Sequence, residues 1–450
     1  MQRSAEQVFR SCLSVAKGFP GDVFWTLADA GWGACASLAR APKRARLWLA
    51  ALPDRGLEAM QSAALAAFDR RWPIVTLSSM LISAMAVSQI SHATPYVKTA
   101  AAKAAPMRLA KHVAKHRPRA VAPSALQSRL AQLAADFDEP VGVAVSDVAT
   151  GWVASVKGDA AFPQQSVSKL WVAITVMDAI DEGRLKLDQA IVLGPGDRSV
   201  FNQPVSYQIG ETGYATTIRD LLRRALIQSD NAANDKLMTA VGGPAAILNL
   251  LNRKAIAGVK LAEDEKHLQA HIAGLTWSPA LAPYGAFDAA RARLPKADRE
   301  AALQAYLDNP YDGASPEGLV NALAALKRGE LLSPASTEWI LATMAQAKTG
   351  PRRLRGGLPA DWSIAHKTGT GQDFRGSSIG INDVAVLTAP DGRAYTVAVM
   401  MQKTAKPVSE RLDFMQAVSK AVVASWKADP RAVIVDDVAD VHTTTKAAGG

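Results

Sequence analysis

The order of strand-like and helical segments predicts an α+β fold, in which helices flank an antiparallel sheet and a long helical segment is inserted into it. Two runs rich in β-branched residues, 141–148 and 152–157, precede a stretch that is helical over most of 166–350. Further strand-like runs follow this stretch, at 362–366, 379–387 and 394–401. Because sheet elements stand on both sides of the insertion, we expect one lobe around the sheet and a second, all-helical lobe.

Two helices and a hairpin complete the sheet lobe. Apolar residues recur with helical period from Ala125 to Phe137, and again from Ser409 to Trp426, where an amphipathic helix closes the lobe. The first two strand-like runs are joined by Ala149-Thr150-Gly151, a short segment that indicates a hairpin. These boundaries predict one globular domain over 123–428.

Three other segments lie outside this domain. Residues 1–72 form a basic, alanine- and tryptophan-rich extension with helical character; Met60 offers an alternative start, which would make 1–59 an artefact of the gene model. The range 96–122 is rich in Ala, Lys and Pro and is expected to be a flexible basic linker. The polar range 429–450 is expected to be a disordered tail.

The segment 73–95 has the features of an export signal. An uncharged, mostly apolar run begins at Pro73 after Arg70-Arg71 and ends at Ser91-His92-Ala93, small residues spaced as a signal peptidase requires. We expect either a cleaved signal peptide, with the domain in the periplasm, or an anchor in the inner membrane facing the periplasm. The basic stretch from Lys98 to Arg119 argues against export, because positive charge is retained on the cytoplasmic side.

Charge and cysteine content exclude several classes of function. The formal net charge is +10, but the basic excess precedes residue 121, so the globular part is close to neutral and no nucleic-acid partner is expected. Cys12 and Cys35 both precede the apolar run, which leaves the domain without a disulfide or thiolate metal site. His112 and His116 have a metal-ligand spacing but lie in the linker. No metal or cofactor is expected, and the protein is expected to be a monomer.

The first candidate motif is Ser166-Val167-Ser168-Lys169, which precedes an apolar helical run. Residues at i and i+3 lie on one helix face, so Lys169 can reach the Ser166 hydroxyl. A serine hydroxyl becomes a nucleophile when a nearby base takes its proton, and lysine can be that base. A serine at a helix N-terminus also has backbone N–H groups aimed at a developing oxyanion. The alternative is two polar residues on an exposed turn.

The second motif is Ser229-Asp230-Asn231. Its hydroxyl and amide, opposite the nucleophile, could relay a proton to a leaving nitrogen and hold a substrate amide. The alternative is a helix cap, because Ser, Asp and Asn are the preferred N-cap residues.

The third motif, Lys367-Thr368-Gly369-Thr370, ends a strand-like run. Lys367 offers a cation and Thr368 a hydroxyl to a substrate carboxylate, while Gly369 lets a ligand lie against the strand. The backbone N–H of Thr370 could complete an oxyanion hole with that of Ser166. The alternative is a glycine-rich turn with incidental charges.

In this order the three motifs are the signature of class A β-lactamases and penicillin-binding proteins, and the chain resembles that family over about 123–428. Phe162-Pro163 and Val241-Gly242-Gly243-Pro244 agree with it. The resemblance implies the two-lobed β-lactamase/transpeptidase-like fold, with the site between the lobes and an acyl-enzyme at Ser166. It implies that Ser229 relays a proton and that Asn231 orients the substrate amide.

The family's deacylating glutamate, in a Glu-x-x-Leu-Asn loop, corresponds in register to Glu265. Here the sequence reads Glu-x-x-Leu-Gln, ending at Gln269, so Glu265 is the candidate base; the alternative is a solvated acidic helix face. The segment between Gln269 and Asp312 is longer than in the family, which should alter access or substrate choice. Glu263 stands where an arginine should pair with Asp312, so that ion pair is lost. No arginine begins the 394–401 strand, and Arg411 is the substitute candidate for binding the substrate carboxylate.

The resemblance leaves three functions open. The first is a β-lactamase, which acylates Ser166 and then hydrolyses the ester. The second is a penicillin-binding-like D,D-peptidase, or another amidase or esterase, with slow deacylation on a peptidoglycan-like substrate. The third is a membrane-tethered sensor, held through 73–95, that is acylated without turnover.

Overall fold

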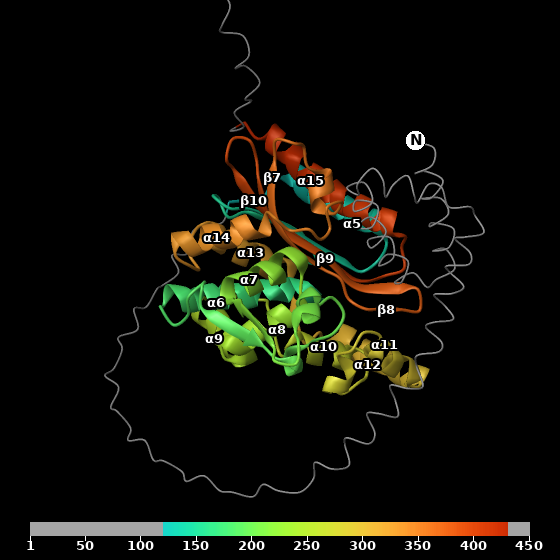
Figure 1. Ribbon diagram of the computed structural model, residues 1–450. Helices are drawn as coiled ribbons and strands as arrows, with labels where there is room; N and C mark the ends of the chain where they lie inside the picture. Colours follow the sequence, from blue (N-terminus) through green and yellow to red (C-terminus); the bar gives the residue numbers. More distant parts are fainter. Residues whose placement is uncertain (1–119, 431–450) are drawn as a thin grey trace, which may run out of the picture. The chain divides into compact units, whose positions relative to one another are not determined.

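A computed structural model describes residues 120–430, which form a sheet lobe and a mainly helical lobe (Figure 1). The helices are α5 (Ser124–Phe137), α6 (Lys169–Asp181), α7 (Ile218–Arg223), α8 (Asn231–Ala240), α9 (Gly243–Arg253), α10 (Glu265–Ile272), α11 (Ala286–Arg293), α12 (Lys296–Asp308), α13 (Pro316–Lys327), α14 (Pro334–Met344) and α15 (Val408–Ala428). The strands are β1 (Val141–Asp147), β2 (Val153–Val156), β3 (Phe162–Pro163), β4 (Ala190–Leu193), β5 (Tyr214–Thr217), β6 (Gly313–Ala314), β7 (Ser363–Gly369), β8 (Asp373–Phe374), β9 (Ser377–Thr388) and β10 (Ala394–Thr404).

The main sheet is antiparallel, with the strand order β2-β1-β10-β9-β7, and β8 pairs with the end of β9. Its two faces are buried under different helices. Along β10, Val397 and Val399 pack in the cluster formed with α5 and α15, whereas Ala398 and Met400 pack in the cluster that includes α13. This alternation is the period of two expected of a strand, and burial on both faces explains why all seven residues of β1 are buried.

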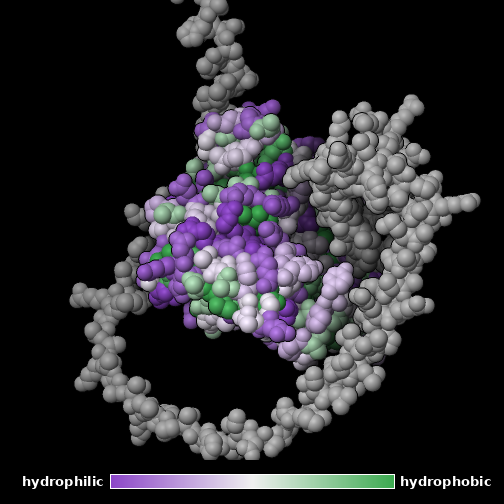
Figure 2. All heavy atoms as spheres, viewed as in Figure 1, coloured by the Kyte–Doolittle hydropathy of each residue, from purple (hydrophilic) through white to green (hydrophobic). Residues whose placement is uncertain are grey.

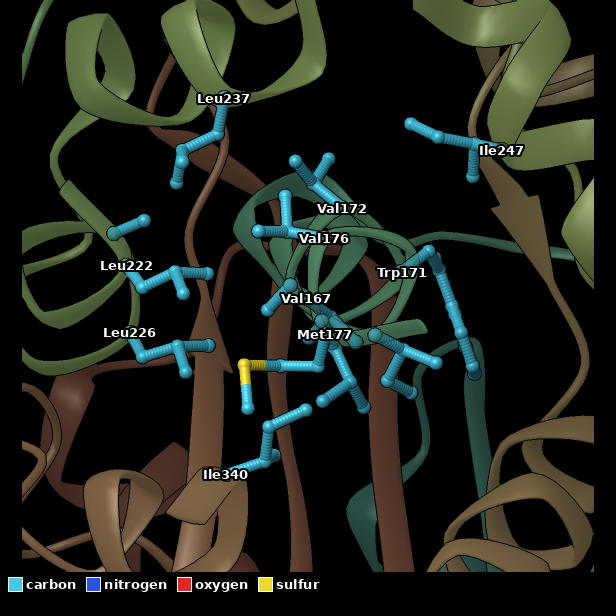
Figure 3. Packing of buried hydrophobic residues seen from close by; sticks show 14 of the residues in the cluster. Val167, Trp171, Val172, Val176, Met177, Leu222, Leu226, Leu237, Ile247 and Ile340 are labelled. Carbon is cyan, nitrogen blue, oxygen red and sulfur yellow. The ribbon is translucent and has the colours of Figure 1, made fainter. Parts of the chain in front are cut away.

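The helical lobe is built around α6, whose side chains are buried from Lys169 to Ala179. Figure 3 shows Trp171, Val172 and Met177 on this helix, surrounded by residues of neighbouring elements. Leu226 comes from the π-helical turn η4 (Arg224–Gln228), and Ile340 from α14. A helix that is apolar on all sides is stable only in the centre of a core, and α6 thereby fixes the position of the turn that precedes it.

The face of the domain that Figure 2 shows is mostly polar. Figure 2 shows a hydrophilic face with small, separate apolar patches. Among residues 120–430, no helix is both long enough and apolar enough to span a membrane.

The expected α+β architecture, with an antiparallel sheet and a helical insertion, is confirmed, as is the hairpin between β1 and β2. The expectation that the inserted lobe is all-helical is wrong in one respect, because β4 and β5 form a two-stranded antiparallel pair within it. The predicted extension 1–72, the segment 73–95, nearly all of the linker 96–122 and the tail 429–450 except its first two residues lie outside the described residues.

Candidate active site

Ser166 lies in the short 3-10 turn η1 (Gln165–Ser168) that leads into α6, and Lys169 is the first residue of that helix. Lys169 Nζ donates a 2.8 Å hydrogen bond to Ser166 Oγ. The Lys169 side chain is buried, whereas Ser166 is partly exposed and therefore open to a substrate. This pair has the nucleophile-and-base geometry expected from the first motif.

Glu265 is the first residue of α10, and its side chain points to Lys169. Lys169 Nζ donates to Glu265 Oε2 at 2.7 Å, inside the protein. Burial opposes ionisation of Glu265, but the charge of Lys169 and hydrogen bonds from Lys169 and Gln269 outweigh it, so the pKa of Glu265 is lowered. The solvated-face alternative fails for Glu265: Asp264 caps the helix and Glu263 pairs with His271, and Glu265 alone of the three is buried.

The second and third motifs meet through Ser229 and Lys367. Lys367 Nζ donates to Ser229 Oγ at 2.9 Å. Burial, followed by the nearby charge of Lys169, holds the pKa of Lys367 well below its ordinary value. The cap interpretation applies only to Asp230, which caps α8, because Ser229 has φ +59° and directs its hydroxyl to Lys367. Asn231 donates from Nδ2 to the Val200 carbonyl at 2.8 Å.

The end of β7 lies directly against η1. A Cβ on Gly369 would be 2.4 Å from the Gln164 carbonyl oxygen, so only glycine allows this approach. Thr368 Oγ1 donates to Thr349 Oγ1 at 2.7 Å, and Thr370 follows at the exposed end of the strand.

The arginine nearest this strand end is Arg353, which the motifs did not indicate. Its guanidinium donates to the carbonyls of Gly369 (2.9 Å) and Asn382 (2.7 Å) and to Thr370 Oγ1 (2.7 Å). Arg411, the substitute expected from the sequence, donates to Ser378 Oγ and to the Lys406 carbonyl, and its role in binding the substrate carboxylate stays a prediction. The only sequence signal for Arg353 is its place in a basic run after Gly350-Pro351.

The long segment after α10 contains α11 and α12 and contacts the site. Asp312 at its end has no arginine partner within 120–430; it accepts from Tyr306 OH at 2.8 Å and from the Gln165 backbone N–H at 2.6 Å. Burial outweighs these two hydrogen bonds and raises the pKa of Asp312 to about 7. Glu263 led us to expect that Asp312 loses its ion pair with an arginine. In its place, Asp312 accepts a hydrogen bond from Tyr306 of α12.

Helix α11 contacts loops on two sides of the site. The ring of Phe287 meets that of Phe201, in the connection between β4 and β5, at 4.9 Å between centroids. Arg291 Nη1 donates to Gln372 Oε1, just after the third motif, at 2.8 Å.

Another buried carboxyl, Asp235 on α8, contacts the first turn of α10. It accepts from the Glu265 backbone N–H at 2.8 Å and from Ser199 Oγ at 2.8 Å. Burial and the negative charges of Asp264 and Glu265 raise the pKa of Asp235 to about 7. In the part of the chain that the structure describes, no three His, Cys, Asp or Glu side chains are grouped so as to hold a metal ion.

Comparisons with known proteins agree with one another. The model of the "Beta-lactamase enzyme family" matches residues 125–426. The extended-spectrum beta-lactamase PER-1 of Pseudomonas aeruginosa is 28% identical over 249 residues, which cover 54% of this chain and 69% of that protein. Beta-lactamase VEB-1 of the same organism is 26% identical over 272 residues, covering 60% and 79%. Among solved structures, the class A beta-lactamase of the last common ancestor of Gram-negative bacteria is similar with a TM-score of 0.54 and 31% identity, covering 67% of this chain and 99% of that one.

Proposed function

This chain belongs to the beta-lactamase enzyme family, and on that premise we propose that it hydrolyses β-lactams through an ester on Ser166. The observation that carries the proposal is the buried contact of one lysine with both the serine hydroxyl and a carboxylate. Lys169 Nζ lies 2.8 Å from Ser166 Oγ and 2.7 Å from Glu265 Oε2. Such an arrangement can take a proton from the serine and later activate a water.

Acylation begins at the lactam carbonyl. Lys169 passes a proton to Glu265 and accepts the Ser166 proton as Oγ attacks the carbonyl carbon. The backbone N–H groups of Ser166 and Thr370 stabilise the oxyanion. The C–N bond of the lactam then breaks, and the nitrogen takes a proton from Ser229 Oγ, which Lys367 Nζ contacts at 2.9 Å. Lys169 reprotonates Ser229 and takes back the proton held by Glu265, so Lys169 is cationic and Glu265 is ionised again in the acyl-enzyme.

Cations and hydroxyl groups at β7 and beside it bind the substrate carboxylate. Lys367 and Thr368 are the primary ligands, and Arg353 adds positive charge through its contact with Thr370. The expectation that Gly369 makes room for a ligand is wrong, because the position of its missing Cβ faces the turn of Ser166, 2.4 Å from the Gln164 carbonyl oxygen. Asn231, beside Val200, binds the amide of the acyl side chain.

Deacylation uses Glu265. The ionised carboxylate takes a proton from a water as that water attacks the ester carbonyl. The C–Oγ bond then breaks, and Ser166 Oγ takes its proton from Lys169, which recovers one from Glu265. Both carboxylate oxygens are held, Oε2 by Lys169 and Oε1 by Gln269 at 2.9 Å, so the base is fixed for this step. A fixed base favours turnover over a long-lived adduct, which is why hydrolysis is preferred to the peptidase and sensor alternatives.

The test is turnover of a chromogenic cephalosporin by the purified protein, with the intact mass recorded in parallel. We expect sustained turnover that disappears in Ser166→Ala. A stable adduct without turnover would replace this proposal by a penicillin-binding or sensor role, and neither adduct nor turnover would refute acylation by β-lactams.

We also propose that the segment 73–95 directs the domain to the periplasm as a signal peptide or inner-membrane anchor. The charged flank, apolar run and small-residue site in the sequence support this. Cell fractionation, followed by N-terminal sequencing of the mature protein, tests it; a protein found only in the cytoplasm with an intact N-terminus would refute it.

A further inference from the structure

Three side chains next to the nucleophile form a closed ring of hydrogen bonds. Tyr306 OH donates to Asp312 Oδ1 at 2.8 Å, and the Gln165 backbone N–H donates to Asp312 Oδ2 at 2.6 Å. Gln165 Nε2 closes the ring by donating to Tyr306 OH at 2.6 Å. The Tyr306 hydroxyl is both donor and acceptor in this ring, so removing it breaks two of the three hydrogen bonds.

The ring holds an unusual backbone conformation directly before Ser166. Gln165 has φ +53°, which a residue with a side chain adopts only when its surroundings impose it. Asp312 imposes it here by binding the Gln165 N–H, and Tyr306 in turn fixes Asp312. The position of the nucleophile's turn is therefore coupled to α12.

The ring continues to Glu265 through one amide. Gln269 Nε2 donates to Gln165 Oε1 at 2.8 Å and to Glu265 Oε1 at 2.9 Å, which uses both of its hydrogens. Gln269 Oε1 accepts from Gln372 Nε2 at 2.9 Å, so the Gln269 side-chain amide cannot rotate by half a turn without losing three hydrogen bonds.

Every member of the chain from Tyr306 to Glu265 is buried. Exposed fractions are 0% for Tyr306, 1% for Gln165, 3% for Gln269 and 4% for Glu265. Because these side chains are buried away from solvent, a broken link leaves unpaired polar groups, so the side chains are held in one arrangement. The Tyr306 ring is itself fixed by packing among apolar residues of α10, α12 and β9: Leu268, Ile272, Leu303, Leu307 and Ile379.

We propose that Tyr306 is a positioning residue for deacylation, which acts through Gln165 and Gln269 to aim the Glu265 carboxylate at the hydrolytic water. The long segment between α10 and Asp312 thus supplies the anchor for the catalytic base. The inference rests on the proposed function, because it assigns Glu265 the role of that base. Tyr306 does not touch the reacting atoms.

The test separates acylation from deacylation in Tyr306→Phe, which keeps the ring and removes the hydroxyl. Burst kinetics with a chromogenic cephalosporin give the acylation rate, and loss of the adduct mass gives the deacylation rate. We expect deacylation to fall roughly ten- to hundredfold, because the aim of the Glu265 carboxylate at the water is lost. Acylation should change less than about threefold, because Tyr306→Phe leaves in place the contacts of Lys169 with Ser166 Oγ and Glu265 Oε2 and the bond of Asp312 to the Gln165 N–H. Tyr311→Phe is the matched control, because its ring lies 6.0 Å from that of Tyr306.

A double-mutant cycle distinguishes positioning from a general effect on folding. Gln269→Met breaks the link to Glu265 without changing α12. If Tyr306 acts through this link, Tyr306→Phe should add little to the loss already caused by Gln269→Met. The inference would be overturned by full additivity of the two losses, or by equal losses in acylation and deacylation. An unchanged deacylation rate in Gln269→Met would also overturn it, and this test holds even if Tyr306→Phe fails to fold. Absence of turnover in the unmutated protein would instead refute the proposed function.

Discussion

The buried carboxyl of Asp235 makes a prediction about the pH dependence of stability. Burial and two neighbouring negative charges raise its pKa from 3.8 to about 7 in the folded protein. The folded state therefore holds this proton more tightly than the unfolded state does. The stability that the protonated group contributes is complete below about pH 4 and is lost as the pH rises through about 7.

The size of the effect follows from the shift. A difference of about three pKa units, at about 1.4 kcal/mol each, sets an upper limit of about 4 kcal/mol at pH 8. Asp235→Asn keeps the side-chain shape and the carbonyl oxygen that accepts from the Glu265 N–H, and its amide can donate to Ser199 Oγ. The long 3.3 Å bond from the Lys266 N–H to the other carboxylate oxygen is lost. The substitution thus removes the ionisation and retains most of the contacts.

Urea unfolding at about pH 4 and about pH 8 measures the prediction. We expect Asp235→Asn to be more stable than the unmutated protein by about 1–4 kcal/mol at the higher pH, and to differ by less than about 1 kcal/mol at the lower pH. Asp361→Asn makes the same chemical change at an exposed position and is the control. An equal difference at both values, or a variant that is less stable at the higher pH, would refute the reasoning.

Two further predictions concern β7 and its arginine. Arg353→Ala should raise KM for carboxylate-bearing β-lactams about tenfold with little change in kcat, because it removes a cation from ground-state and transition-state binding alike. Steady-state kinetics measures this, with Arg352→Ala at an exposed position as the control. An unchanged KM in Arg353→Ala would contradict the prediction. Gly369→Ala should lower kcat/KM by about a hundredfold or more and stability by about 1–3 kcal/mol, because the new Cβ would lie 2.4 Å from the Gln164 carbonyl and displace the turn of Ser166. Activity of Gly369→Ala equal to that of the unmutated protein would show that the strand can move freely.

The sheet could be predicted from the sequence because its strands are long and their residues alternate between two buried faces. The expected range 394–401, for example, corresponds to β10, which extends three residues further. The pair β4–β5 could not be predicted from the sequence, because each strand has only four residues, most of them exposed or partly buried. A long connection also separates the two strands. Strands of this kind carry no hydrophobic period.

The site could be predicted where its chemistry lies in short motifs. Ser166 and Lys169 are one helical turn apart, so their contact follows from spacing alone. Arg353 and Tyr306 were missed because only tertiary packing brings them to the site. Arg353 is one of several arginines in a surface-like run, and Tyr306 belongs to a helix with ordinary composition.

The central claim is that Glu265 releases an acyl group from Ser166, and its most direct test is the fate of the adduct in Glu265→Gln. The variant is mixed with a cephalosporin, and the protein is digested and mapped by mass spectrometry over time. We expect a long-lived acyl group on the peptide that contains Ser166, and rapid turnover without such a group in the unmutated protein. Deacylation at an unchanged rate, or an adduct on a different residue, would contradict it.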